Sequence, residues 1–401
     1  MNTIAHSGFL SRLRTDRSWW LAGGLIVLAV VYPFIVETLQ VLPLIGDFVP
    51  RTGSMVLMLV VTMMALGLNV VVGYAGLLDL GYVAFYAAGA YTAGWLASLQ
   101  FEDVTFHFGS TVSNDKPGLH VSMWLVLAVA GVFTTIVGIL IGLPTLRLRG
   151  DYLAIVTLGF GEIVPQFVRN ADEQGIGFDL TNGTFGISPI DSLGFGAFVF
   201  REERNKDDLY YWTAIALLLF TVYCCIRLRD SRLGRAWIAI REDETAAAAM
   251  GVPLMRTKTW SYAIGAFFGG IAGAFYSSFK AGAFPADFFF NISIFILCMV
   301  ILGGMGSIWG VIAGGMILGY LNIEGLSTIG SKVQDAGLNF DPTKYQFGIY
   351  GFIIVVMMLF RPTGLIPERR HKIELAEGVR DTPFYDVQTE GTLTDRDMSD
   401  D

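Results

Sequence analysis

The sequence contains little charge. Only 15% of its 401 residues are charged and 53% are hydrophobic, whereas a soluble domain carries about 25% charged residues. From Trp19 to Phe360, apolar residues gather in runs of roughly 17 to 25, the length of helix that crosses a ~30 Å hydrocarbon core. Such runs are too long for the alternating strands of a membrane β-barrel. The composition therefore excludes a soluble domain and predicts an all-α, multi-pass protein of the cell membrane.

Residues that carry chemistry are also scarce. The three cysteines, Cys224, Cys225 and Cys298, lie in or beside apolar runs, where we interpret them as packing residues and not as a disulfide. The four histidines lie in polar flanks, outside any metal-binding pattern. The segment GLSTIGSK, 325–332, has one residue too many before its lysine for a phosphate-binding loop, and we place it in an external loop. We expect no catalytic site, no metal and no cofactor, so any ATP is used by another chain.

The apolar runs define ten candidate spans: 19–38, 53–73, 76–99, 121–143, 152–168, 210–227, 259–279, 288–303, 306–323 and 346–360. Only GGMGS separates the eighth from the ninth. These two are either one long bent element or short segments that do not both cross, so the number of spans lies between 8 and 10.

Lysine and arginine predict the orientation, because they are retained on the cytoplasmic side. With ten spans, most basic residues of the short connections fall on one side, which we take as the cytoplasm and which then holds both termini. The predicted organisation is a cytoplasmic segment at 1–18, a transmembrane domain at 19–360 and an acidic, disordered tail at 361–401. Within the domain, the loop 228–258 is cytoplasmic and the loop 169–209 is external.

Glu162 is a candidate for the transport path. It lies 11 residues past Asp151, about 16 Å into a helix that rises 1.5 Å per residue. An acid near the middle of the membrane is costly and is often functional. Its neighbours Gly159, Gly161 and Pro165 interrupt the helix as in transporter binding sites. The alternative is a carboxyl group that holds the bundle together through a hydrogen bond.

Asn69 and Asp79 are weaker path candidates. Asn69 lies within a span, where an amide commonly forms a hydrogen bond between helices. Asp79 follows Gly73 and Gly76 and lies near the cytoplasmic end of its span, where the helix dipole favours an acid. A structural role is the simpler interpretation of both residues.

The stretch GRAWIAIREDETAAAAMG, 234–251, interrupts this apolar chain with four consecutive charges. Helix-forming residues and a stop at Gly251 predict a helix here. One interpretation is an interfacial helix on the lipid surface. However, anionic headgroups would repel Glu242, Asp243 and Glu244. The acids therefore favour a protein partner in the cytoplasm.

Several separated blocks resemble one family, the permease subunits of branched-chain amino-acid ABC importers of the LivM type. The blocks are GLNVVVGYAGLLDLGYVAFYAAGAYTAG (67–94), LRLRGDYLAIVTLGFGEIV (146–164), GRAWIAIREDETAAAAMGV (234–252), LGGMGSIWGVIAG (302–314) and RPTGLIPERR (361–370). They follow the order of the family and cover most of the chain from about residue 53 to 370.

The resemblance implies a complex with a homologous second permease, two cytoplasmic ATPase subunits and an extracytoplasmic solute-binding protein. The loop then resembles the element that docks on the ATPase, with coupling residues Gly234, Arg235, Arg241, Glu242, Asp243, Glu244 and Gly251. It departs from the EAA-x3-G pattern of another importer class, since Thr245 stands in the first position, so only the role of the loop is carried over. Arg147, Arg149, Gly150 and Asp151 form a second cytoplasmic signature, which we expect near the ATPase interface.

Three classes of function are open to a multi-pass membrane protein. The favoured one is an ATP-driven importer of branched-chain or other neutral amino acids, and a closely similar importer of urea or short-chain amides is the alternative within this class. An ion-coupled secondary transporter would need no docking loop and would use Glu162 or Asp79 for coupling. A membrane enzyme is disfavoured by the lack of a catalytic cluster.

Overall fold

A computed structural model describes residues 29–36, 38–41, 46–102, 104–110, 112, 116–148, 150–195, 198–203, 205–335 and 341–366. The predicted segment 1–18 and the predicted tail from residue 367 onward lie outside the described residues. Of the predicted first span, residues 29–36 and 38 are described and helical.

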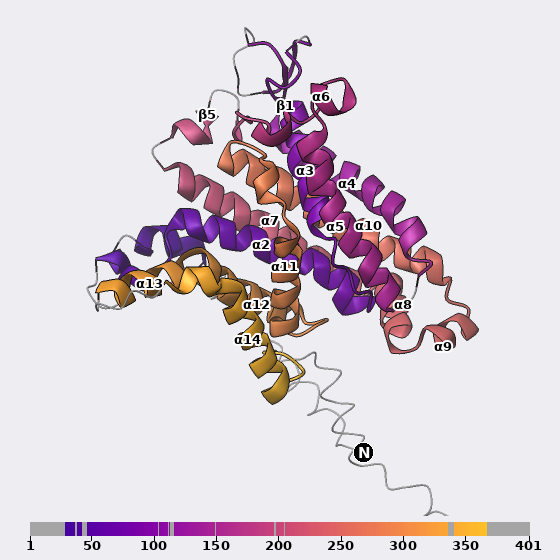
Figure 1. Cartoon of the computed structure of the whole chain (residues 1–401). Coiled ribbons are helices and arrows are strands. Elements are labelled where there is room, and N and C mark those ends of the chain that lie inside the picture. The colour runs from indigo at the N-terminus through magenta and orange to yellow at the C-terminus, as the bar shows by residue number, and fades with distance from the viewer. Residues whose placement is uncertain are drawn as a thin grey trace, which may run out of the picture.

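The described chain is mainly helical, as predicted (Figure 1). The helices are α2 (Thr52–Asn69), α3 (Val83–Leu96), α4 (Met123–Thr145), α5 (Asp151–Asn170), α6 (Glu173–Ile176), α7 (Lys206–Arg229), α8 (Arg232–Glu242), α9 (Glu244–Ala249), α10 (Leu254–Lys280), α11 (Phe290–Gly303), α12 (Ile308–Tyr320), α13 (Leu326–Asp335) and α14 (Gln346–Phe360). Within the described residues, eight helical segments are long and apolar enough to cross a membrane. This confirms a polytopic helical protein, while the full number of spans and the side of the termini stay predictions.

The centre of the bundle is formed by α2 and α10, and close backbone approaches hold it together. A Cβ atom at Gly273 of α10 would overlap the carbonyl oxygen of Tyr86 in α3, and one at Gly138 of α4 would lie 2.6 Å from the Cβ of Ala266. Small residues allow this approach in lipid, where no hydrophobic effect drives helices together. Glycine at these positions therefore lets the helices pack closely. All three cysteines are free, as predicted.

The predicted span 76–99 is shorter than expected. Its helix, α3, begins at Val83, and residues 75–82 form an irregular segment in which Gly76 adopts a φ of +68°. Gly81 lies so close to α5 that a Cβ atom would overlap the carbonyl oxygen of Thr157. The Leu80 N–H donates to Thr157 Oγ1 across 3.1 Å. This contact with a neighbouring helix replaces the first helical turns that hydropathy alone predicts.

The region around GGMGS contains two helices. α11 ends at Gly303 and α12 begins at Ile308, and a Cβ atom at Gly303 would overlap the carbonyl oxygen of Gly310. The two therefore pack closely as a helical hairpin and do not form one bent element.

The segment GLSTIGSK was wrongly predicted as a loop. After α12 the chain continues through a π-helical turn, Leu321–Gly325, into α13. Leu326 and Gly330 are buried, while Lys332 lies 3.3 Å from Asp47. Because the face with Leu326 and Gly330 packs against other parts of the chain, the helix continues beyond the apolar residues of α12.

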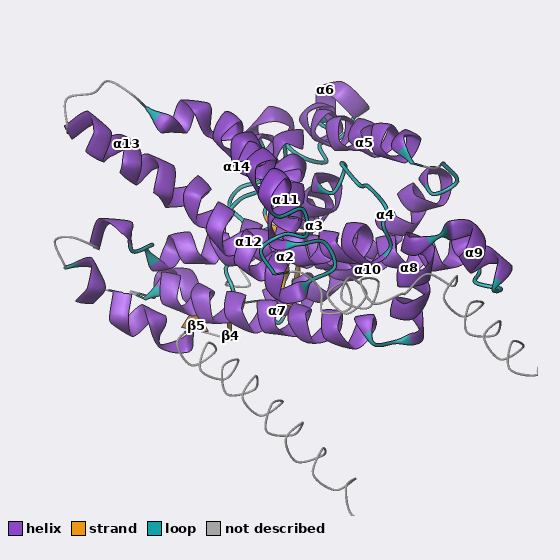
Figure 2. Ribbon diagram, turned by 90° about the horizontal axis from the view of Figure 1, so that it is seen from below, coloured by secondary structure: helices purple, strands orange, loops and turns teal. Residues whose placement is uncertain are grey.

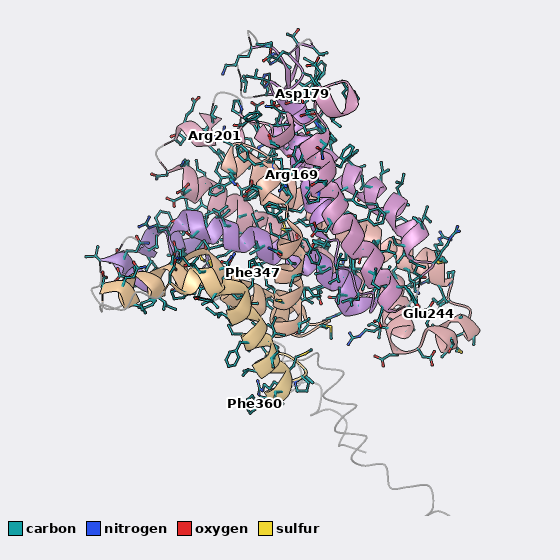
Figure 3. All side chains as sticks on the ribbon, in the orientation of Figure 1. Arg169, Asp179, Arg201, Glu244, Phe347 and Phe360 are labelled. Atoms are coloured by element: carbon teal, nitrogen blue, oxygen red, sulfur yellow. The ribbon has the colours of Figure 1, made fainter. Side chains whose placement is uncertain are left out.

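Short strands gather at one end of the molecule, at the top of Figure 1. β3 (Leu119–Val121) pairs antiparallel with β1 (Ala97–Ser98) and parallel with β2 (Phe106–Phe108). β4 (Gly194–Phe195) pairs with β5 (Phe198–Val199). We call this end the strand end. Asp179 and Arg201 lie there in Figure 3, whereas Glu244 lies far from them, beside α8 and α9.

Candidate functional site: the α8–α9 loop

The predicted cytoplasmic loop is helical, as expected, but it contains two helices. Ser231 precedes α8, and its Oγ accepts a hydrogen bond from the Gly234 N–H across 3.1 Å. Asp243 separates the helices and accepts from the N–H groups of Thr245 at 2.7 Å and Ala246 at 3.0 Å. Side-chain acceptors at these positions satisfy the free N–H groups of a helix start. The loop is therefore a defined element with a break at Asp243.

Trp237 anchors α8 in the protein. Its side chain is fully buried, and its Nε1 donates to the carbonyl oxygen of Thr257 in α10 across 2.8 Å. Ile240, one turn later, is buried beside it. A helix that only lay on the lipid surface would turn these residues towards lipid. Instead, the apolar face of α8 packs on the first turns of α10.

Arg241 joins the loop to the end of α2. Its Nη1 donates across 2.5 Å to the carbonyl oxygen of Gly73, in the π-helical turn Val70–Tyr74 that ends α2. Its aliphatic stem lies against Gly76, where a Cβ atom would come within 2.9 Å of Arg241 Cγ. A guanidinium group on a helix-terminal carbonyl satisfies an acceptor that has lost its helical partner. The loop therefore contacts the start of the irregular segment 75–82 directly.

The three acids of the loop differ in their surroundings. Glu244 lies 2.7 Å from the Nζ of Lys258, whose side chain is buried. Asp243 caps α9, and the Thr245 hydroxyl together with two backbone N–H groups lowers its pKa. Glu242 is exposed and forms no hydrogen bond or ion pair with the residues described. Of the three acids, only Glu242 can therefore bind a partner without losing a contact that stabilises the loop.

The remaining loop residues predicted for coupling lie on its surface or at its turns. Arg235 is exposed and donates to the carbonyl oxygen of Asp230 across 3.0 Å. Gly234 is buried so tightly that a Cβ atom would overlap the carbonyl oxygen of Arg229. Gly251 adopts a φ of +83° after α9, and Met250 beside it is 85% exposed. Glu242 and Met250 thus offer charge and apolar surface on the same loop.

The second predicted signature forms the turn between α4 and α5. Arg147 and Asp151 are exposed, and Gly150 adopts a φ of +56° with open space around it. Arg149 lies outside the described residues. Both views place this turn at the same end of the molecule as α8 and α9 (Figures 1 and 2). Its expected place near an ATPase interface stays a prediction.

The three path candidates lie in different environments. Asn69 is buried, and its Oδ1 accepts from the Gly306 N–H across 2.9 Å, which joins α2 to the α11–α12 turn. Asp79 is buried, and its Oδ1 accepts from the Gly81 N–H across 2.8 Å. Glu162 lies on the exposed face of α5. The structure therefore does not bring these three residues together, and their roles in transport stay predictions.

Sequence reasoning missed two features of this site. The carbonyl oxygen of Gly73 carries no side-chain signal, so its contact with Arg241 could not be found from residue types. Lys258 precedes the predicted span 259–279, but in the structure it lies four residues after the start of α10, where its buried ammonium group needs an acidic partner. Glu244 supplies that partner. Because hydropathy places Lys258 outside the span, residue types alone did not predict its burial or this ion pair.

Comparisons with known proteins agree with this architecture. The family described as "Branched-chain amino acid transport system / permease component" matches residues 51–358. No solved structure matches the chain.

Three relatives illustrate the similarity. The high-affinity branched-chain amino acid transport system permease protein LivM of Escherichia coli is 35% identical over 373 residues, 88% of this chain and 76% of that protein. The probable branched-chain amino acid transport permease protein LivM of Methanocaldococcus jannaschii is 29% identical over 325 residues, 76% of this chain and 90% of that protein. The permease protein LivH of Escherichia coli is 29% identical over 154 residues, 38% of this chain and 44% of that protein.

The match covers the described bundle from the start of α2 almost to the end of α14. Similarity to both LivM and LivH indicates a pair of related permeases. The chain therefore belongs to the family of permease subunits of branched-chain amino-acid ABC importers, and it is a multi-pass membrane transport subunit, not an enzyme.

Proposed function

We propose that this chain forms part of the translocation path for branched-chain and other neutral amino acids in an ATP-driven importer. A homologous second permease completes the path, an extracytoplasmic binding protein delivers the solute, and two cytoplasmic ATPase subunits supply the energy. The chain holds no cofactor of its own. The α8–α9 loop receives the movement of the ATPase.

The bond between Arg241 and Gly73 is the observation that carries this proposal. α8 is fixed to α10 through Trp237 and to α2 through Arg241, and these are the two central helices of the bundle. A displacement of the loop therefore acts on both helices at once. Packed elements of this kind change between discrete arrangements, and a ligand or partner shifts the balance between them.

The experiment is charge reversal at the exposed acid. Glu242→Lys changes the surface of the loop without removing the cap at Asp243 or the ion pair of Glu244. In the reconstituted complex, we expect ATP-driven uptake of labelled leucine to fall at least tenfold while the protein still inserts and binds its partner permease. The matched control is Glu202→Lys, an exposed acid near the strand end. Equal uptake by the Glu242→Lys variant and the control would contradict the proposed role of the loop.

The solute is tested separately. Uptake of labelled amino acids is compared with uptake of labelled urea in the same complex with its own binding protein. We expect branched-chain amino acids to be accumulated only when ATP is present. Accumulation of urea alone, or accumulation driven by an ion gradient without ATP, would contradict the proposal.

A further inference from the structure

The exposed face of α5 differs from the exposed faces of α4 and α14. α4 and α14 turn only apolar residues and glycine outward along their membrane-spanning lengths, for example Val132, Ile136, Leu140, Phe352 and Val355. These faces suit lipid tails. On α5, by contrast, Glu162, Gln166 and Asn170 are all exposed.

The three polar residues of α5 form a line. They are spaced four residues apart, and residues at this spacing lie above one another on a helix. α5 has 20 residues and is therefore about 30 Å long, close to the thickness of the hydrocarbon core. Glu162 lies near its middle, and the line runs from there to the end of the helix at Asn170.

Glu162 has no partner among the residues that the structure describes, since no hydrogen bond or ion pair joins it to another side chain or backbone group. A charged group facing lipid at this depth is costly, and charged residues in spans almost always face a protein interior or water. The other side of α5 is already packed, with Thr157, Gly161 and Pro165 buried. The exposed face is therefore expected to meet water or a polar group that lies beyond the described residues.

The orientation of this face is fixed by two contacts of α5 with neighbouring segments. The Arg169 guanidinium group lies 4.8 Å from the ring centroid of Phe289, and Thr157 Oγ1 accepts from the Leu80 N–H. Rotation of α5 about its axis would break both contacts. In Figure 2, α5, α11 and α14 lie along one side of the molecule, opposite α7.

We propose that the exposed face of α5 lines the solute path and that the Glu162 carboxylate binds the ammonium group of a zwitterionic amino acid. This inference rests on the proposed function. A zwitterion that loses its water in the membrane needs an anionic partner for its ammonium group. Ile155, two turns before Glu162, and Ile163, the next residue along α5, are both exposed and offer apolar surface to an aliphatic side chain. The Gln166 side-chain amide and the Asn170 Oδ1 supply hydrogen bonds along the route to the end of the helix, while the Asn170 Nδ2 donates to the Gln166 carbonyl oxygen across 2.7 Å.

The first experiment measures access of water to this face. In the assembled complex, with Cys224, Cys225 and Cys298 replaced by alanine, single cysteines are placed by Glu162→Cys and Gln166→Cys. Matched controls are Ile136→Cys and Leu140→Cys, which are also exposed on α4. We expect a cationic, membrane-impermeant thiol reagent to label the α5 positions at least tenfold faster than the α4 positions. Equally slow labelling on both helices would overturn the proposal.

The second experiment tests the role of the carboxylate. We expect Glu162→Gln to lower ATP-driven leucine uptake at least tenfold, with ATPase activity stimulated by the binding protein kept within twofold, and Glu162→Asp to recover part of the uptake. Wild-type uptake by Glu162→Gln would overturn the assignment. Loss of the assembled complex in Glu162→Gln would also overturn it, because it would assign Glu162 to a contact with the second permease.

Different results would contradict the proposed function and the proposed role of α5. If the unmodified complex shows no ATP-driven uptake of neutral amino acids, the proposed function fails. The cysteine labelling requires no transport, so it still reports whether α5 faces water.

Discussion

The Arg241 guanidinium group donates a hydrogen bond across 2.5 Å to the carbonyl oxygen of Gly73, 168 residues earlier in the chain. This bond places the last turn of α8 on the end of α2, at the point where the helix gives way to the irregular segment 75–82. The same arginine stem covers Gly76. A single side chain thus joins the surface loop to the centre of the bundle.

Removal of this bond is expected to uncouple the loop from the bundle. A hydrogen bond to a charged group is worth about 1.5–3 kcal/mol, so Arg241→Ala should lower uptake about tenfold or more at unchanged membrane insertion. Arg241→Lys keeps one donor and should lose less. The measurement is leucine uptake per ATP hydrolysed in the reconstituted complex. Arg229→Ala serves as control, because its contact with Asp230 is a surface ion pair. A normal uptake ratio in Arg241→Ala would contradict the coupling role.

Substitution of Trp237 is expected to destabilise the loop. Trp237→Ala removes a fully buried side chain, which costs about 3–5 kcal/mol. Trp237→Phe keeps most of the volume but loses the bond to Thr257, a loss of about 0.5–1.5 kcal/mol. In detergent, the unfolding temperature should be highest for the wild type, lower for Trp237→Phe and lowest for Trp237→Ala. If Trp237→Ala unfolds at the wild-type temperature, α8 is not held by this contact.

The cap at Asp243 gives the loop a defined pH dependence. Hydrogen bonds from Thr245 and Ala246 lower the pKa of Asp243 below its ordinary value. The ionised cap therefore stabilises α9 fully when the pH is above the ordinary pKa of Asp. This stabilisation is lost as the pH falls through the lowered pKa of Asp243. The ordinary pKa of Asp is about 3.9. We therefore expect no change of α9 between neutral and mildly acidic pH, and fraying only below about pH 4. Cleavage of the loop by a protease, followed against pH, measures this.

Two variants of Asp243 act as controls for the pH experiment. Asp243→Asn keeps an oxygen acceptor and should remove the pH dependence while preserving α9. Asp243→Ala should increase cleavage at every pH. Equal protection of the wild type and the Asp243→Ala variant would show that the cap does not hold the helix.

The packing of α3 on α10 predicts that a larger side chain destabilises the protein at one glycine and is tolerated at another. Gly273 lies against the backbone of Tyr86, whereas Gly351 in α14 has open space around it. Gly273→Leu should destabilise the bundle by about 1–3 kcal/mol or more, because extra volume in a packed core forces backbone shifts. Gly351→Leu should be tolerated. Thermal unfolding of the two purified variants tests this, and equal melting temperatures would contradict the packing described.

The length of the apolar runs was sufficient to predict a polytopic helical protein, because lipid requires long apolar helices with their backbone groups bonded internally. Helix-forming residues and the stop at Gly251 also predicted helix in the 228–258 loop. Most span boundaries followed from hydropathy. The start of α3 did not, since the irregular segment before it is stabilised by Thr157 of another helix.

The sequence by itself therefore determined which segments enter the membrane and that a charged element interrupts them. Only the tertiary structure decided which acids of the 234–251 stretch are bound to neighbouring groups and which one is not. Glu242, Asp243 and Glu244 look alike in sequence, but Lys258 pairs with Glu244, and the start of α9 is capped by Asp243. The tertiary structure also decided that Asn69 bonds to Gly306 inside the bundle while Glu162 lies exposed on α5. The physical reason is that hydropathy is a local property of the chain, whereas the partner of a polar group is supplied by segments that folding brings together.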